Sequence, residues 1–430
     1  MFRSLPIKFN KFAGLKYIIS KMNVNEIRAH FPILSEKLPG GKDLVYLDNA
    51  ATSQRPKEVT DKYLRLSLKS NANIHRAVHH LAAEATEQYE NARDAVKEFI
   101  GAASRKEIIF TSGSTASINT VAYSFGSQFV ERGDNIIVST AEHHSNIVPW
   151  QLLAKRKGAE VRVLPVDDDG HLRIDLLPGL IDKYTRLVAV SHISNVLGLV
   201  NPVKEVVRIA HEKNVPVLID GAQGIVHEKV DVQDIGCDFY VFSGHKMYAV
   251  PFTGVLYGRQ ELLEQMPPFL GGGEMIASVS LENGTTFAPL PGKFEAGTQN
   301  FTGIPTLTDA ITFCKQLRDK EIEDYQQKVT DYMLDSLLSD NRIILYGVPR
   351  GNISKTPLFS FSVKGAHHED LALILDKMGI AVRSGQMCAE PIMDRFGVTG
   401  MVRASFAPYN TLEEAEYFIK SLDRAIKMLV

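Results

Sequence analysis

Residues 215–246 read VPVLIDGAQGIVHEKVDVQDIGCDFYVFSGHK and contain two apolar segments, each followed at once by a polar turn. The segments VPVLI and FYVF are continuously apolar, which is typical of strands buried on both faces of a mostly parallel sheet. Asp220 follows the first segment, and Ser243-Gly-His-Lys246 follows the second. Ligands of such sheets bind beyond the carboxyl ends of the strands. This stretch therefore predicts an α/β fold with functional side chains at one sheet edge.

The same alternation of short apolar segments and amphipathic stretches extends along the chain in both directions. A glycine-rich, irregular segment is expected at 266–297, and one long helix from Thr306 to about Leu338. The C-terminal part mixes strands with helices, which indicates a second, α+β unit. Further strands are expected at 44–47, 108–110, 136–139, 161–165, 187–191, 254–257, 343–346, 358–362 and 381–383, and helices at 83–100, 117–125, 203–213 and from Leu412.

These expectations divide the chain into a large domain and a smaller one. The large domain spans 44–311 and the small C-terminal domain 312–430, with 22–43 packing against the small domain as an N-terminal segment. Residues 1–21 are basic and lack acidic residues, which resembles an organelle transit peptide. Because Met22 could itself begin a protein, we interpret them as an upstream start or a disordered extension.

Composition excludes several classes of protein. The 430 residues carry 48 Lys and Arg against 50 Asp and Glu, and 44% of them are hydrophobic, as in ordinary globular proteins. No apolar run reaches the roughly 18 residues that span a membrane, and no basic stripe indicates a nucleic-acid partner. The three cysteines, Cys237, Cys314 and Cys388, are too scattered for a disulfide framework, so a cytoplasmic location is expected.

Three turns at expected strand ends have complementary chemistry. Thr111-Ser-Gly-Ser-Thr115 opens a helix and could bind a phosphate, although this turn alone could be an ordinary helix cap, Asp220 alone a turn-forming residue and Lys246 alone a surface lysine. Asp220 could keep a pyridine nitrogen protonated, and Lys246 could form an imine with an aldehyde. Together they are the groups that pyridoxal 5′-phosphate (PLP) requires, and they predict that cofactor.

Two further segments carry candidate chemistry. Glu142-His-His-Ser145 could suggest zinc, but no second Cys/His cluster has ligand spacing, so no metal is predicted and a histidine stacked on the cofactor ring is preferred. Cys388 lies in a glycine-containing loop between Arg383 and Arg403, where positive potential favours a thiolate. Arg403 could bind a substrate carboxylate in a bidentate pair.

From Val24 to the C-terminus the chain resembles the SufS-type cysteine desulfurases, class V aminotransferase-like PLP enzymes of fold type I. The short spacing from the cysteine to the following arginine is similar to the SufS branch rather than the NifS/IscS branch. The resemblance implies a homodimer with a large, mostly parallel α/β domain flanked by helices and a smaller α+β domain. It rests on YLDNAAT (46–52), EHHSNIVPWQ (142–151), SNVLG (194–198), DGAQ (220–223), CDFYVFSGHK (237–246), FEAGT (294–298) and RASFAPYNT (403–411).

The resemblance also implies a role for each matching residue. Lys246 would carry the cofactor as an imine and act as acid and base at the substrate Cα, and Cys388 would accept the sulfur. Asp220 would pair with the pyridine nitrogen, Gln223 with the phenolic oxygen, and His143 would stack on the ring. The phosphate would be held by Ser114, Thr115, Ser243 and His245, with Thr298 reaching the partner subunit's site, and the substrate carboxylate by Asn195 and Arg403 with Arg383 nearby.

The implied reaction converts L-cysteine to L-alanine and leaves a persulfide on Cys388. A SufE- or SufU-like acceptor protein would collect that sulfur for iron–sulfur cluster assembly. Selenocysteine lyase activity on the same scaffold, and another class V activity such as transamination or epimerisation, stay open. A non-catalytic scaffold homologue is a further alternative.

Three departures from the family pattern bear on rate and partner. Gln386 and Met387 stand where two histidines usually precede the cysteine. Tyr248-Ala-Val-Pro-Phe-Thr-Gly254 replaces the common YGPTGxG, and Ala116 replaces a frequent glutamate. None of them removes a group that the implied chemistry requires.

Overall fold

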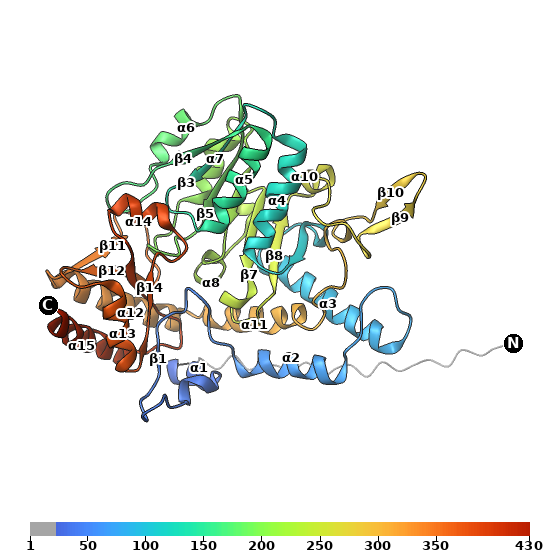
Figure 1. Ribbon diagram of the computed structural model, residues 1–430. Helices are drawn as coiled ribbons and strands as arrows, with labels where there is room; N and C mark the ends of the chain where they lie inside the picture. Colours follow the sequence, from blue (N-terminus) through green and yellow to red (C-terminus); the bar gives the residue numbers. More distant parts are fainter. Residues whose placement is uncertain (1–22) are drawn as a thin grey trace.

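A computed structural model describes residues 23–430 and shows two larger sheets with helices packed around them, together with two two-stranded pairs (Figure 1). The extension expected at 1–21 lies outside the described residues. The larger sheet has seven strands in the order β2-β8-β7-β6-β5-β3-β4, and β8 alone runs against its neighbours. The expected mostly parallel α/β sheet is therefore confirmed. Its strands are β2 (Ile108–Thr111), β3 (Asn135–Ser139), β4 (Glu160–Leu164), β5 (Thr185–Ser191), β6 (Val217–Asp220), β7 (Phe239–Ser243) and β8 (Gly254–Gly258).

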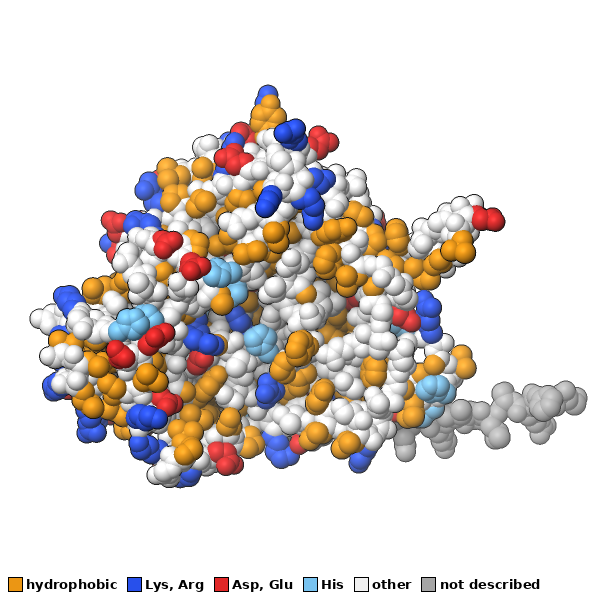
Figure 2. Space-filling model, in the orientation of Figure 1, with side chains coloured by type: hydrophobic (Ala, Val, Ile, Leu, Met, Phe, Trp, Pro, Cys, Tyr) orange, Lys and Arg blue, Asp and Glu red, His pale blue; other side chains and the backbone are white. Residues whose placement is uncertain are grey.

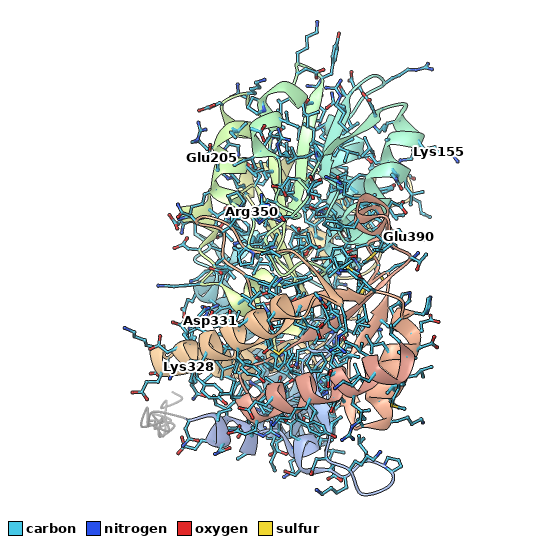
Figure 3. All side chains as sticks on the ribbon, turned by 90° about the vertical axis from the view of Figure 1, so that its left-hand side faces the viewer. Lys155, Glu205, Lys328, Asp331, Arg350 and Glu390 are labelled. Carbon is cyan, nitrogen blue, oxygen red and sulfur yellow. The ribbon has the colours of Figure 1, made fainter. Side chains whose placement is uncertain are left out.

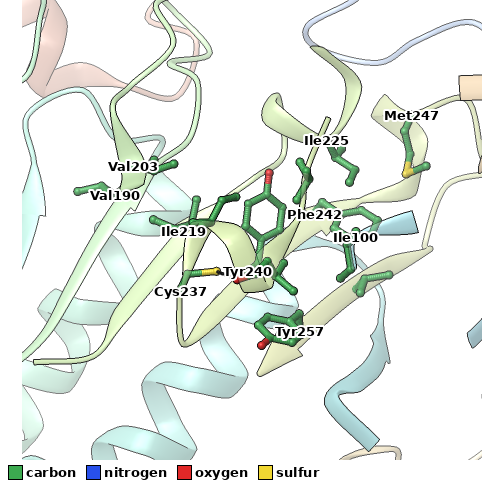
Figure 4. Close-up of a cluster of buried hydrophobic side chains, with 14 of the residues drawn as sticks. Ile100, Val190, Val203, Ile219, Ile225, Cys237, Tyr240, Phe242, Met247 and Tyr257 are labelled. Atoms are coloured by element: carbon green, nitrogen blue, oxygen red, sulfur yellow. Dashed lines mark hydrogen bonds between the residues drawn. The ribbon is translucent and has the colours of Figure 1, made fainter. Parts of the chain in front are cut away.

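Continuously apolar strands arise because this sheet has a hydrophobic core on each face. In β7, Tyr240 and Phe242 belong to one core, whereas Phe239 and Val241 belong to the other. Figure 4 shows the first core, where Tyr240 lies among Ile219 and other strand and helix residues. Helices contributing to that core are α3 (His80–Phe99), α6 (Leu177–Leu180), α7 (Val203–His211), α8 (Gly224–His227), α9 (Val232–Ile235) and α11 (Leu307–Leu317), and those on the opposite face are α4 (Ser114–Phe129), α5 (Val148–Lys157) and α10 (Gln260–Gln265).

The C-terminal part has its own sheet and core. Its four strands have the order β11-β12-β15-β14 and pair antiparallel throughout. A separate cluster of buried residues, including Phe359, Phe361 and Phe418, lies between this sheet and its helices. The elements are α12 (Lys320–Ser339), β11 (Ile343–Tyr346), β12 (Leu358–Val363), α13 (His368–Lys377), β14 (Arg383–Gly385), α14 (Glu390–Phe396), β15 (Met401–Ser405) and α15 (Leu412–Leu429).

The N-terminal segment contacts this C-terminal part. Helix α1 (Val24–Ala29) carries Arg28, which lies 2.9 Å from Glu414 of α15. Strand β1 (Val45–Tyr46) pairs with β13 (Ile380–Ala381) rather than with the large sheet. Helix α2 (Lys57–Lys69) then leads into the large sheet region (Figure 1). The division into domains at 44–311 and 312–430 stays a prediction.

Two expectations about secondary structure were wrong. The long helix expected from Thr306 is two helices, because the Asp319 side chain accepts a hydrogen bond from the amide of Glu321 and starts α12 as a new helix. The segment expected to be irregular at 266–297 contains an antiparallel hairpin, β9 (Ile276–Ser280) and β10 (Gly284–Phe287). The hairpin projects from the body of the molecule (Figure 1), so no buried face gave it an apolar pattern.

A buried ion pair anchors the segment that carries Thr298. Glu295 lies 2.7 Å from Arg93 of α3, and the two residues are 5% and 1% exposed. We expect Glu295→Gln to lower the free energy of unfolding by about 2 kcal/mol, because buried Arg93 then keeps only the partly exposed Glu90, 3.1 Å away, as its counter-charge. Urea unfolding followed by the fluorescence of Trp150, the single tryptophan, measures the effect. The exposed pair of Arg173 and Asp175 is the control.

For that control, Asp175→Asn is expected to change stability by less than about 0.5 kcal/mol, because both partners are surrounded by water. Equal small losses in both variants would contradict the expected stabilisation by the buried pair.

Candidate active site

A cavity of about 360 Å³ lies where the carboxyl ends of the large sheet's strands face the C-terminal part. In Figure 2, histidine and cationic side chains gather at this junction. The cavity brings together every residue predicted for the site except Thr298. These residues are Ser114, Thr115, His143, Asn195, Asp220, Gln223, Ser243, His245, Lys246, Arg383, Cys388 and Arg403.

Asp220 and Lys246 reach the cavity from neighbouring strands. Asp220 ends β6, Lys246 follows β7, and the two strands pair in parallel, so both side chains emerge at the same sheet edge. Burial lowers the pKa of Lys246 to about 8, while the nearby Asp220 carboxylate opposes that shift. Burial also raises the pKa of Asp220, whose carboxylate accepts a hydrogen bond from the amide of Ala222. A carboxylate and an amine of shifted pKa are thus held together away from bulk water.

The amino end of α4 forms a small polar cradle beside them. Ser243 Oγ accepts a hydrogen bond from the Ser114 amide at 2.8 Å and lies 2.9 Å from the Ser114 hydroxyl. A Cβ added at Gly113 would lie 3.2 Å from Ser243 Oγ, and one added at Gly254 would lie 2.3 Å from Gly113. Glycines at both positions therefore let the two turns approach closely. Helix-end amides and hydroxyls in this arrangement suit an anion such as a phosphate.

Two histidines of the cavity are neutral. Burial, aided by the charge of Lys246, lowers the pKa of His143 to about 4, and the same causes lower that of His245 to about 4. The His143 ring is fixed by Ser145, whose hydroxyl lies 2.7 Å from its Nδ1. A fixed, uncharged imidazole is suited to stacking against an aromatic ring.

The paired histidines do not meet their neighbouring glutamate. Glu142 is fully buried and accepts hydrogen bonds from Ser139 and Asn146, whereas His144 Nε2 accepts one from the amide of Glu390. Within residues 23–430 no three His, Cys, Asp or Glu side chains are grouped so that they could hold a metal ion.

The two arginines share a carboxylate that the sequence reasoning missed. Asp48 lies 3.1 Å from Arg403 and 3.3 Å from Arg383, which face each other on adjacent strands β15 and β14. Arg403 is buried, and its Nε–H has no hydrogen-bond partner among the described residues. One carboxylate against two guanidinium groups leaves a net positive charge, which suits a substrate carboxylate. The YLDNAAT motif contains Asp48, but nothing local to it indicated this contact.

The cysteine lies on a tight turn at the cavity mouth. Cys388 is exposed, whereas Cys237 and Cys314 are buried. Asn195, predicted to orient the substrate, donates from its side-chain amide to the carbonyl of Met387 at 3.0 Å, and its own carbonyl accepts from Arg403. The turn is therefore tied to the strand ends of the large sheet.

Thr298 is exposed and lines a second, larger cavity of about 780 Å³ on the described part of the chain. Phe252, from the loop that departs from the family pattern, lines the same cavity and has a φ of +58°, which side-chain-bearing residues rarely adopt. Ala116 also lines it. Two of the three departures from the family pattern, the loop 249–254 and Ala116, therefore lie at the larger cavity. The third, at 386–387, lies in the turn that carries Cys388.

The family model described as aminotransferase class-V matches residues 45–418. The chain belongs to this family. A protein named cysteine desulfurase from Klebsiella pneumoniae (strain 342) is 46% identical over 407 residues, covering 95% of this chain and 99% of the relative. The expected family and the PLP-dependent fold are confirmed.

Solved structures give the same result. The cysteine desulfurase CsdA of Escherichia coli, in an S-sulfonic acid form, is 39% identical with a TM-score of 0.87 and covers 95% of this chain and 100% of its own. A NifS-like protein is less similar, with 27% identity and a TM-score of 0.78 over 90% of this chain and 100% of its own. This difference agrees with the branch expected from the cysteine-to-arginine spacing.

Class V aminotransferases are PLP-dependent, and the residues of the smaller cavity are compatible with that cofactor. An anion cradle, a buried carboxylate, a neutral imidazole and an amine of lowered pKa line one cavity of suitable size. In the part of the chain that the structure describes, no helix is long and apolar enough to cross a membrane.

Proposed function

We propose that this class V protein is a cysteine desulfurase that converts L-cysteine to L-alanine and leaves a persulfide on Cys388. The observation that carries the proposal is that Lys246, Asp220, Arg403 and Cys388 line one cavity although they come from both sheets. An amine for the cofactor, a carboxylate for its ring, a guanidinium for the substrate and a thiol for the sulfur are the set that this reaction needs.

The cofactor would be PLP, and different residues of the cavity would hold its phosphate and its ring. Ser114, Thr115, Ser243 and His245 would hold the phosphate, Asp220 would pair with the ring nitrogen, Gln223 with the phenolic oxygen, and His143 would stack on the ring. When bound, PLP withdraws electrons from the substrate Cα. Lys246 Nζ then removes and returns the proton there, and Arg403, Asn195 and Arg383 orient the carboxylate.

The sulfur step balances without an external oxidant or reductant. The Cys388 thiolate attacks the substrate sulfur, a sulfur–sulfur bond forms, and the carbon–sulfur bond breaks. The electron pair of the broken bond stays with the substrate Cβ, which takes a proton to become the methyl group of alanine. The two sulfurs are oxidised and the carbon is reduced. Regeneration of the thiol then requires a thiol reductant or an acceptor protein.

The direct test is alanine formation from L-cysteine by the PLP-loaded protein in the presence of dithiothreitol. Alanine and sulfide in equal amounts are expected, and L-selenocysteine is the comparison substrate. Alanine from L-selenocysteine only would make the protein a selenocysteine lyase and overturn the proposal. A transaminase would instead give a keto acid and no alanine from L-cysteine.

The lowered pKa of Lys246 predicts how cofactor capture by the apo-protein depends on pH. Only the neutral amine attacks the aldehyde, and with a pKa of about 8 its fraction falls tenfold for each pH unit below that value. We expect the rate of PLP capture to rise with pH and to level off above about 8. Stopped-flow absorbance measures it. A rate that still rises at about pH 10 would mean that Lys246 is solvated like a surface lysine.

The proposal also includes a homodimeric assembly, a protein that accepts the sulfur, and a cytoplasmic location. The working unit is a homodimer, in which Thr298 of each subunit reaches the phosphate position of the other. Support comes from the exposure of Thr298 beside the larger cavity, where Phe252 and Leu270 are also exposed. A SufE- or SufU-like protein takes the sulfur toward iron–sulfur clusters. A cytoplasmic location agrees with the three unpaired thiols.

A further inference from the structure

The turn that carries Cys388 is strained. Met387 and Cys388 have φ values of +50° and +55°, in the left-handed region that favours glycine. Two consecutive side-chain-bearing residues in this region cost free energy, and such backbone persists only where its surroundings hold it. The contacts of this turn therefore decide where the Cys388 thiol lies.

His144 makes two hydrogen bonds to the chain directly after the Cys388 side chain. Its main-chain N–H donates to the carbonyl of Cys388 at 2.7 Å. Its ring Nε2 accepts a hydrogen bond from the amide of Glu390 at 3.1 Å. Glu390 is the first residue of α14, and Ala389 before it has no side chain that could cap the helix, so the His144 ring takes that place.

The position of His144 in the chain couples the turn to the cavity. His143, the preceding residue, lines the cavity with Lys246, and α5 begins four residues after His144. Glu390 and Lys155 of α5 lie on the same side of the molecule, with Lys155 farther from the C-terminal part (Figure 3). The Glu390 carboxylate lies 3.9 Å from the His144 ring and does not compete for its Nε2 contact with the amide.

We propose that His144 is a positioning residue for the sulfur-transfer step. Its ring, acting as the acceptor for the Glu390 amide, holds Met387 and Cys388 in the left-handed conformation and so fixes the Cys388 thiol at the cavity mouth. The inference rests on the proposed function, because it assigns His144 to the step in which Cys388 accepts sulfur.

The test compares His144→Ala, His144→Asn and His144→Gln in the PLP-loaded enzyme. The Gln side chain can place an oxygen near the position of Nε2, whereas the Asn side chain is one methylene too short. We expect kcat for alanine formation to fall about tenfold in the Ala and Asn variants and to recover to within about threefold of the parent in Gln. KM for L-cysteine should stay within about twofold, because substrate contacts are untouched.

Two further measurements separate positioning from general stability. The absorbance change of the cofactor on mixing with L-cysteine should have the parent rate in all variants, while persulfide on Cys388, followed by mass spectrometry in one turnover, forms more slowly in Ala and Asn. Hydrogen exchange of residues 386–396 should be faster in Ala and Asn than in Gln, and it reports on the turn without any activity.

His367→Ala is the matched control. The exposed His367 ring accepts from the Glu369 amide at the start of α13, so the variant removes the same kind of cap away from the cysteine. It should keep the parent kcat. The inference would be overturned if His144→Ala kept the parent kcat, or if His144→Gln did not recover it. It would also be overturned if KM for L-cysteine rose by the same factor by which kcat fell. Failure of the parent itself to form alanine would instead refute the proposed function.

Discussion

The Cys388→Ala variant is expected to lose alanine formation from L-cysteine by at least about a thousandfold while it still binds PLP. Removal of a nucleophile removes the step itself, so that only weak residual catalysis is left. Amino-acid analysis of alanine in the presence of dithiothreitol measures the loss. The absorbance of the bound cofactor, and its change on addition of L-cysteine, should be those of the parent, because Cys388 lies at the cavity mouth and not in the phosphate cradle.

Cys237→Ala is the control for this variant. Cys237 is fully buried in the same core as Tyr240 and Phe242, so substrate cannot reach it. Burial also raises the pKa of its thiol, which therefore stays protonated. Its replacement should lower stability modestly and leave kcat within about twofold of the parent, as expected for a small cavity in the core. Alanine formation at the parent rate by Cys388→Ala would remove Cys388 from the mechanism.

The Lys246→Ala variant is expected to lose activity by at least about a thousandfold and also to lose covalent attachment of the cofactor. The lysine is proposed both to bind the aldehyde and to move the Cα proton, so one substitution removes two functions. Borohydride reduction of the parent followed by peptide mapping should find the cofactor on the peptide that contains Lys246. Lys246→Ala should show no labelled peptide.

Peptide mapping also distinguishes Lys246 from Lys355, a second buried lysine that could react with an aldehyde. It is the other buried lysine of the described chain whose pKa burial lowers markedly, to about 7. It lies outside the smaller cavity and donates to the carbonyl of Gly347 at 2.9 Å. Label on Lys355 instead of Lys246 would contradict the assignment of the cofactor site.

Much of the site could be predicted from local sequence. Continuously apolar segments marked β6 and β7, and the polar residues directly after them had to emerge at one sheet edge because parallel neighbours end together. The sequence therefore predicts Asp220 and Lys246 at the same sheet edge, and both line the same cavity in the structure. The family motifs added further residues of the cavity, among them His143, Asn195 and Gln223.

Local signals failed where the physical cause lies elsewhere in the chain. Helix α11 ends at Leu317, and the Asp319 side chain starts α12 as its N-cap, which apolar periodicity does not indicate. The β9–β10 hairpin projects into solvent, so neither strand needs a buried face. Thr298 lines the larger cavity rather than the smaller one, and its predicted contact belongs to a partner subunit.

The order of residues along the chain was sufficient to predict the mostly parallel sheet and the family of PLP-dependent enzymes, because the apolar segments and the motifs each extend over a few neighbouring positions. The tertiary structure alone joined Asp48 to Arg383 and Arg403, and His144 and Asn195 to the Cys388 turn. These contacts connect residues far apart in sequence, and they exist only when the cores of the two parts have packed. The position of the Cys388 thiol is therefore decided by contacts of the folded chain, and we expect the proposed sulfur transfer to depend on them.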